Sequence, residues 1–254
     1  MLPLAEILAS IDWSDPRLYG VAGVAVLAGF VRGFTGFGTG MVFIPAVSAI
    51  YDPITAIALL FLIDTGASTP ILIPHFRNCR WREVAPVAFA ASVAFPFGLM
   101  FLLRVDAELT RWVLSGFVLF AVAAMASGVR YKGEPKVGHS LAVGGATGFL
   151  SGAIGLGGPV MVLFWLGGPE RAARVRSNIF AFFGLFSIVS FVGYWWSGLF
   201  TAGRLLAALA LLPLYAGSLM LGSKLFNRAT DETYRRAALV LCALIAVATI
   251  PVWR

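Results

Sequence analysis

Long apolar runs, several of them as long as a membrane-spanning helix, recur along this chain. Crossing about 30 Å of hydrocarbon takes about 20 helical residues. A soluble domain carries about 25% charged residues, whereas this chain has 12%. Backbone groups in a bilayer are satisfied only by helices or a closed barrel, and the alternation typical of strands is absent, so we expect an all-α polytopic membrane protein. The runs of full spanning length are 54–75, 84–104, 110–129, 173–195 and 203–225, with 234–252 close to it.

The charged and cysteine residues exclude several other classes. Lys and Arg outnumber Asp and Glu by 19 to 12, but they lie between apolar runs, which indicates topology signals instead of a nucleic-acid surface. Cys79 and Cys242 lie in a basic loop and in the last apolar run, so we expect no disulfide. Two cysteines and two distant histidines form no metal-binding pattern, and we expect no metal or cofactor. Residues 1–15 lack the basic start of a cleavable signal.

One glycine-rich motif occurs twice. Residues 29–42 (GFVRGFTGFGTGMV) align with residues 148–161 (GFLSGAIGLGGPVM) at an offset of 119. The same offset, with small gaps, relates Gly98 to Gly217 and His75 to Tyr194. This self-similarity indicates a duplicated membrane unit. The matched residues are Gly29, Phe30, Gly33, Gly36 and Gly38 in the first motif and Gly148, Phe149, Gly152, Gly155 and Gly157 in the second. The predicted parts of the chain are an N-terminal segment 1–16, a first repeat 17–130, a linker 131–137 and a second repeat 138–254.

The apolar stretches beside each motif are too short to cross a bilayer alone. If each motif segment crossed once, nine basic residues would lie on each side, with Arg32 left out. If each is a hairpin returning to its own side, the split becomes 13 to 5, as the positive-inside rule favours. Each unit is then a re-entrant or broken-helix hairpin plus three transmembrane helices, and this odd number of crossings predicts inverted repeats with both termini outside. The short stretches are 18–31, 41–51, 139–150 and 159–167; the basic majority is Arg77, Arg80, Arg82, Arg130, Lys132, Lys136, Arg171, Arg174, Arg176, Lys224, Arg228, Arg235 and Arg236, against Arg17, Arg104, Arg111, Arg204 and Arg254.

The clustered glycines need a reason, since each costs a helix roughly 0.8–1 kcal/mol relative to Ala. Small residues allow close helix packing. A helix break inside the membrane also leaves amide groups at a half-helix N-terminus free to hold an anion. Interrupted segments at matching positions of two repeats indicate a transport site. We therefore take Gly36, Gly38, Gly155 and Gly157 as candidate substrate-binding positions.

Two charged residues lie in apolar surroundings. Asp64, midway along the run 54–75, is the only carboxylate that clearly lies deep inside a predicted membrane segment. A carboxylate there is energetically costly unless it is paired or hydrated. Its presence suggests coupling to a proton or a cation. The other interpretation is a structural partner for Arg32, and the two can coexist. Arg32, inside the first motif, suits an oxyanion through its planar donors, although it can also snorkel to the interface.

Several uncharged polar residues complete the candidate site. Thr35, Ser177 and Asn178 are candidate substrate-binding donors, although a helix-packing hydrogen bond explains any one of them better than a ligand does. Tyr194, with Trp195 and Trp196, ends an apolar run and predicts an interfacial aromatic belt. His75 and His139 lie near loops without partners that would suggest catalysis. The remaining donors near these segments are Thr39, Ser68, Thr69 and Ser151.

The duplicated G-F-x-x-G-x-x-G-x-G signature, the turns Asp52-Pro53 and Gly168-Pro169, and the segment HFRNCRW at 75–81 together resemble the TauE/SafE family, also called the toluene-sulfonate uptake permease family. The likeness runs from about residue 20 to about residue 250. It implies transport of sulfite, sulfoacetate or related organosulfonates, by exporters in most members. The second copy departs from the first at Pro159, where the first has Gly40.

The sequence therefore predicts a secondary transporter of a small anion such as sulfite or an organosulfonate. We expect a multi-pass protein of a bacterial inner membrane, working by alternating access as an exporter, with a proton or sodium as coupling ion. The lipid bilayer is its surrounding, no nucleic acid is expected, and a homo-oligomer is left open. An anion channel could share the same hairpins. A membrane-embedded enzyme is disfavoured because no Ser-His, Cys-His or paired-acid arrangement lies in the apolar runs.

Overall fold

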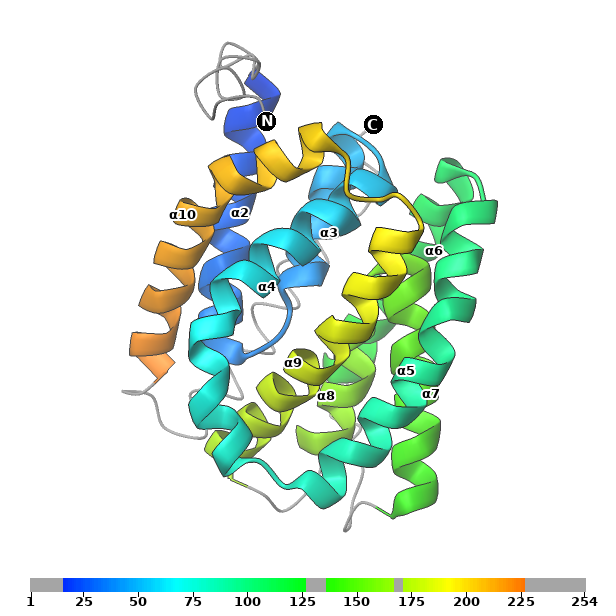
Figure 1. The fold of residues 1–254 in the computed structure, drawn as a ribbon, viewed down its shortest axis with the longest axis vertical. Coiled ribbons are helices and arrows are strands. Elements are labelled where there is room, and N and C mark those ends of the chain that lie inside the picture. Colours follow the sequence, from blue (N-terminus) through cyan, green and yellow to red (C-terminus); the bar gives the residue numbers. More distant parts are fainter. Residues whose placement is uncertain (1–15, 127–135, 167–170, 227–254) are drawn as a thin grey trace.

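The computed structural model describes residues 16–126, 136–166 and 171–226, all in helices and short connections. This part of the chain contains no strand, and five of its helices are long and apolar enough to cross a membrane. The prediction of an all-α multi-pass membrane protein is confirmed (Figure 1). The helices are α2 (Pro16–Thr35), α3 (Thr39–Ile50), α4 (Pro53–Asn78), α5 (Trp81–Arg104), α6 (Ala107–Ala126), α7 (Val137–Ile154), α8 (Gly158–Leu166), α9 (Ala172–Trp196) and α10 (Ala202–Phe226).

Both glycine motifs form the turns of helical hairpins. α2 ends at Thr35 and α3 runs back beside it towards the end of the molecule where α2 began (Figure 1). α7 and α8 do the same from the opposite end. Left-handed Gly38 precedes α3, and left-handed Gly155 closes α7, as φ > 0 requires glycine at these turns. The chain therefore reverses its direction at each glycine motif.

The first helix of this hairpin is longer than the sequence predicts. The stretch 18–31 is too short to span, but α2 continues through Arg32 and Gly33 to reach 20 residues. The helix can extend because Arg32 is buried and paired instead of ending the apolar run. The predicted runs 110–129 and 234–252 reach beyond what the structure describes, as does the turn Gly168-Pro169.

Asp52-Pro53, the first of the two predicted turns, starts α4. The Asp52 carboxylate accepts a hydrogen bond from the Thr55 amide at 2.9 Å and one from the Thr55 hydroxyl. An aspartate N-cap satisfies a free amide of the first turn, and proline is tolerated at the first helical position because its missing N–H would be unpaired there anyway. These two residues therefore set the start of the helix that carries Asp64.

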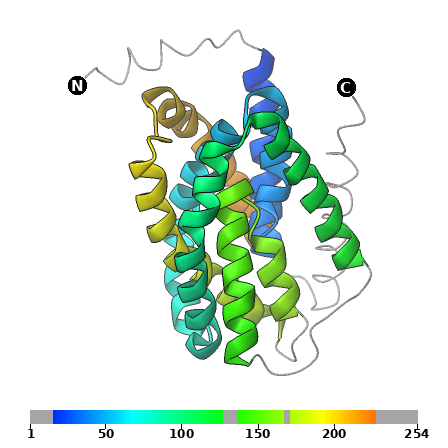
Figure 2. The same ribbon diagram turned by 90° about the vertical axis from the view of Figure 1, so that its right-hand side faces the viewer.

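Helices from the two halves of the chain pack in reciprocal pairs. α5 packs along α7, and α10 packs along α2 (Figures 1 and 2). A Cβ at Gly148 would lie 2.1 Å from the carbonyl oxygen of Ala91, and one at Gly29 would lie 2.6 Å from that of Tyr215. Side chains at these glycines would force the helices apart, so close packing is one role of the repeated glycines.

The same contacts correct one pairing inferred from the offset. A Cβ at Gly98 would lie 2.0 Å from the Phe149 carbonyl oxygen, and a Cβ at Gly222 would lie 2.3 Å from the Phe30 carbonyl oxygen. Phe30 and Phe149 are equivalent in the two motifs, so Gly98 corresponds to Gly222. Gly217, the partner given by the offset of 119, has no atom near its Cβ position. The offset therefore stays at 119 from the motifs to the starts of α4 and α9 and grows to 124 at Gly98 and Gly222.

Candidate functional site

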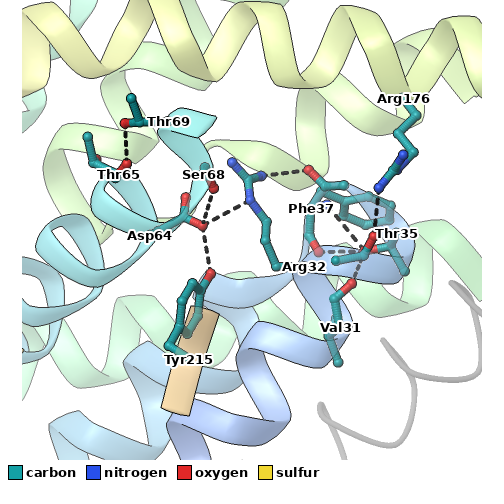
Figure 3. A network of polar contacts seen from close by, with 12 residues as sticks. Val31, Arg32, Thr35, Phe37, Asp64, Thr65, Ser68, Thr69, Arg176 and Tyr215 are labelled. Carbon is teal, nitrogen blue, oxygen red and sulfur yellow. Dashed lines mark hydrogen bonds and ion pairs between the residues drawn. The ribbon is translucent and has the colours of Figure 1, made fainter. Parts of the chain in front are cut away.

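A buried ion pair lies where α2, α4 and α10 converge (Figure 3). Nε of Arg32 on α2 lies 3.0 Å from Oδ1 of Asp64 on α4. The same oxygen accepts hydrogen bonds from the Tyr215 hydroxyl at 2.6 Å and from the Ser68 hydroxyl at 3.2 Å. The Arg32 side chain is 3% exposed and that of Asp64 22%, so the carboxylate is the more accessible member. The interpretation of Asp64 as a partner of Arg32 is thus correct.

Arg32 also closes the end of its own helix. Its Nη1 donates to the carbonyl oxygen of Gly36 at 2.6 Å, and a cation at a helix C-terminus offsets the negative end of the helix dipole. The guanidinium carbon lies 4.4 Å from the ring centroid of Phe183 and 5.0 Å from that of Phe180. Arg32 therefore does not snorkel to an interface; ring faces, a carbonyl and a carboxylate hold it inside the protein.

Two adjacent cavities meet at this ion pair. The larger, about 110 Å³, runs between α4 and α9, and the smaller, about 80 Å³, lies at the two hairpin turns. One water molecule needs about 10–15 Å³ of such space, so each cavity can hold several water molecules or a small anion. Arg32 and Asp64 are the charged residues among the described residues that line either cavity. Both cavities share Arg32, Leu60, Asp64, Ser151, Gly155 and Phe183.

The smaller cavity faces the start of two helices. Its wall includes Thr39 and Gly40 at the start of α3, and Gly158 and Pro159 at the start of α8. The first amides of a helix have no partner within the helix, and the positive end of the helix dipole favours an anion there. The two turns touch, since a Cβ at Gly40 would lie 2.8 Å from the Leu156 side chain.

The four candidate glycines do not lie in equivalent places. Gly38 and Gly157 line the smaller cavity and Gly155 lines both. Gly36 lines neither; its φ is 81° and its carbonyl accepts from Arg32, so it ends α2. Gly38 and Gly155 have φ values of 86° and 72°, where a side chain would be strained. Gly157 has an ordinary φ, but a Cβ there would lie 2.1 Å from the Thr147 carbonyl oxygen.

The three candidate polar donors lie away from both cavities. The Thr35 hydroxyl bonds to the backbone of Val31 and Phe37 and so holds the first turn (Figure 3). Ser177 donates to the Ala173 carbonyl and lies 3.1 Å from Nδ1 of His75. These contacts favour the helix-packing interpretation of both hydroxyls.

Asn178 bridges two elements instead of facing a cavity. Its side-chain oxygen accepts from the Arg80 amide at 2.8 Å, and its side-chain nitrogen donates to Glu83 Oε2 at 3.1 Å. Arg80 also pairs with Glu83. Asn178 thereby ties α9 to the start of α5, and the Glu83 that it contacts is a buried carboxylate, unlike the partly exposed Asp64.

Tyr194 differs from the belt prediction. It is 4% exposed, its ring packs against Phe61 and Phe95, and its hydroxyl lies 3.4 Å from the Ser151 carbonyl. It lines the larger cavity. Trp195 and Trp196 are exposed by 65% and 87%, as an interfacial belt requires. Successive residues of a helix face different directions, so one run of aromatics splits between interior and surface.

Two residues of the site were missed from the sequence. Tyr215 and Phe183 look like ordinary apolar-helix residues, although each contacts the ion pair. The one available signal was the offset that aligns Phe183 with Asp64. Nothing in the sequence around Tyr215 indicates its partner, because that contact joins α10 to α4 through tertiary packing.

Several membrane-length helices, two glycine-turn hairpins and an ion pair beside two largely apolar cavities are features of a multi-pass membrane transport protein. The chain belongs to the sulfite exporter TauE/SafE family, whose model matches residues 21–249. A curated relative from Cupriavidus necator, described as "Probable sulfite/organosulfonate exporter TauE", is 23% identical over 210 residues. That match covers 80% of this chain and 82% of the relative. No solved structure matches the chain.

Proposed function

We propose that this protein is a secondary transporter that exports a small anion, such as sulfite or an organosulfonate, across a bacterial inner membrane. One observation carries the proposal: the buried guanidinium of Arg32 lines both cavities, and no described residue accepts a hydrogen bond from its Nη2. A buried cation with free donors that faces a cavity favours an oxyanion ligand, since arginine matches the planar geometry of such groups.

The N-termini of α3 and α8, which face the smaller cavity, support the same substrate class. Amides near Gly38 and Gly157 can attract an anion without burying another full charge. The rest of the cavity walls is largely apolar, and apolar surroundings strengthen those electrostatic interactions. The family name and the described relative add sulfite and organosulfonates as the chemical class.

Asp64 is the proposed coupling residue. It is partly exposed to the larger cavity and bonded to residues of two other helices, so a change in its charge alters contacts between helices. A proton or sodium ion bound to Asp64 would change its contacts with both Arg32 and Tyr215. Intramembrane carboxylates of this kind mark ion pathways in transporters.

Reciprocal contacts support alternating access between inverted repeats. His75 stacks on Phe180 at 4.5 Å between ring centroids, and Tyr194 meets Phe61 at 5.1 Å. The offset of 119 relates His75 to Tyr194 and Phe61 to Phe180, so each pair is the counterpart of the other. Such reciprocity is expected if residues 17–130 and 138–254 are related by an approximate two-fold axis and exchange conformations during transport.

Flux measurements in proteoliposomes test this function. We expect saturable uptake of sulfite or a sulfonate from a small panel that also contains carboxylates, driven by a proton or sodium gradient. Asp64→Asn should abolish gradient-driven flux, while Glu83→Gln, which removes a buried carboxylate away from the cavities, should retain it. Flux that rises linearly with concentration would indicate the alternative, an anion channel. Absence of flux for every anion would refute the proposed function.

A further inference from the structure

Asp64 uses only part of the guanidinium of Arg32. Oδ1 contacts Nε, Nη1 donates to Gly36, and Nη2 donates to no described residue. The strongest arginine–carboxylate pairs use two parallel hydrogen bonds, and this pair does not. An oxyanion that enters the cavity therefore meets an arginine with unused donors.

The Asp64 carboxylate likewise uses only one of its two oxygens for contacts within the protein. Oδ1 accepts from Tyr215 and Ser68 and pairs with Arg32, whereas no described residue donates to Oδ2. Figure 3 shows Oδ2 of Asp64 and Nη2 of Arg32 on the side away from Tyr215. Since Asp64 is partly exposed and lines both cavities, Oδ2 is the atom that water in the cavity can protonate.

The ion pair is neutral as a unit. The other elements packed against it present uncharged groups to it: Thr39 from α3, Ser151 from α7, Phe183 from α9 and Tyr215 from α10. Among further ionisable groups, Tyr194 lines the larger cavity as a neutral phenol, while His75 and Arg176 contact the Phe180 ring beside Arg32 and line neither cavity. A monovalent anion added here would leave an uncompensated buried charge, which is strongly unfavourable.

We infer that the transported anion displaces Asp64 from Arg32, and that Asp64 takes up one proton for each monovalent anion bound. This rests on the proposed function and adds the coupling ion and the charge balance. Oδ2 of the carboxylate gains a proton from cavity water and becomes a neutral acid, while Nε and Nη2 of Arg32 turn to the anion. Tyr215 and Ser68 still hold Oδ1. When the anion leaves, the proton returns to water and the ion pair re-forms.

The consequence is electroneutral movement of a monovalent sulfonate with one proton in the same direction. A membrane potential then exerts no net force on the loaded site. Net flux follows the product of the anion and proton concentrations on the two sides. Export therefore occurs when the anion accumulates inside the cell strongly enough to outweigh the opposing proton gradient.

Titration calorimetry of the full-length protein with methanesulfonate tests the proton uptake. Titrations at neutral pH in two buffers of different ionisation enthalpy should give close to one proton taken up per anion. Affinity should fall about tenfold per pH unit above that point. Asp64→Asn should bind with no proton uptake and no such pH dependence, whereas Glu83→Gln should keep both. Wild-type binding without proton uptake would overturn the inference.

Proteoliposomes test the charge balance. A potassium diffusion potential with valinomycin should leave methanesulfonate flux unchanged, while a pH gradient should change it severalfold. Flux that follows the potential, or that needs sodium at constant pH, would overturn the inference and leave an anion transporter. If neither methanesulfonate nor sulfite binds to the wild type, the proposed function itself is wrong.

Discussion

The Tyr215 hydroxyl donates to Oδ1 of Asp64 across 2.6 Å and so joins α10 to α4 at the buried ion pair. Tyr215 itself is fully buried. The contact links two helices that the sequence places about 150 residues apart, so it can transmit the state of Asp64 from one half of the chain to the other.

This contact predicts strong coupling between the two side chains. Tyr215→Phe should lower stability by about 1.5–3 kcal/mol, because a hydrogen bond to a charged group is worth about that much. In an Asp64→Asn background the same change should cost clearly less. Thermal unfolding of the four proteins in detergent gives the coupling energy. Equal losses in both backgrounds would show that the hydroxyl contributes through packing alone.

A second prediction concerns the first glycine turn. Gly38→Ala places a Cβ on a residue with φ of 86°, at about 1–2 kcal/mol, and into the wall of the smaller cavity. Anion affinity should fall more than protein yield. Gly217→Ala, where a Cβ meets no atom within 4 Å, is the matched control. Unchanged affinity in Gly38→Ala would restrict that glycine to a structural role.

The second turn should respond differently. A Cβ at Gly157 would collide with the Thr147 carbonyl oxygen and the Ser151 hydroxyl. Gly157→Ala must therefore displace the start of α8, and we expect losses of both yield and anion binding. Size-exclusion profiles and calorimetry measure the two effects. The sequence alone predicts equal behaviour for Gly38 and Gly157; the structure separates them, and normal yield with normal binding in Gly157→Ala would contradict it.

The close packing of α7 on α5 can be tested by substituting glycines of α7. Gly148→Ala should destabilise by about 1–3 kcal/mol, as overpacking does, because its Cβ would lie 2.1 Å from the Ala91 carbonyl oxygen. Gly145→Ala on the same helix meets no atom and should stabilise by roughly 0.5–1 kcal/mol. Thermal unfolding distinguishes the two signs. Similar melting temperatures would show that α5 and α7 do not pack this closely.

The orientation in the membrane is testable by cysteine labelling. Cys79, a thiol whose pKa is raised by burial, and Cys242 are first replaced. Single cysteines at Arg80 and Lys136 should then react only from the cytoplasmic side, and one at Arg17 only from outside, since the basic residues favour the first face. The starts of α2 and α5 lie at opposite ends of the molecule (Figure 1), and in the sequence Arg17 follows the first residue of α2 while Arg80 directly precedes α5. Labelling of all three from one side would contradict the hairpin topology.

The sequence by itself determined the membrane helices, the duplicated glycine turns, the family and the presence of two charged residues, Arg32 and Asp64, in apolar segments. Hydropathy, glycine spacing and a charge in an apolar run are local properties, so they are visible without a fold. The turn at Asp52-Pro53 was readable for the same reason.

Only the tertiary structure decided which groups face each other. It placed Tyr215 and Phe183 at the ion pair, moved Ser177 and Asn178 away from the cavities, and paired Gly98 with Gly222. Contacts between helices depend on their rotation and axial shift, and a few residues of gap rotate a helix by a large angle at 3.6 residues per turn. The rotation and axial shift of each helix are fixed by the packing of the whole bundle. The sequence of a single helix therefore does not reveal them.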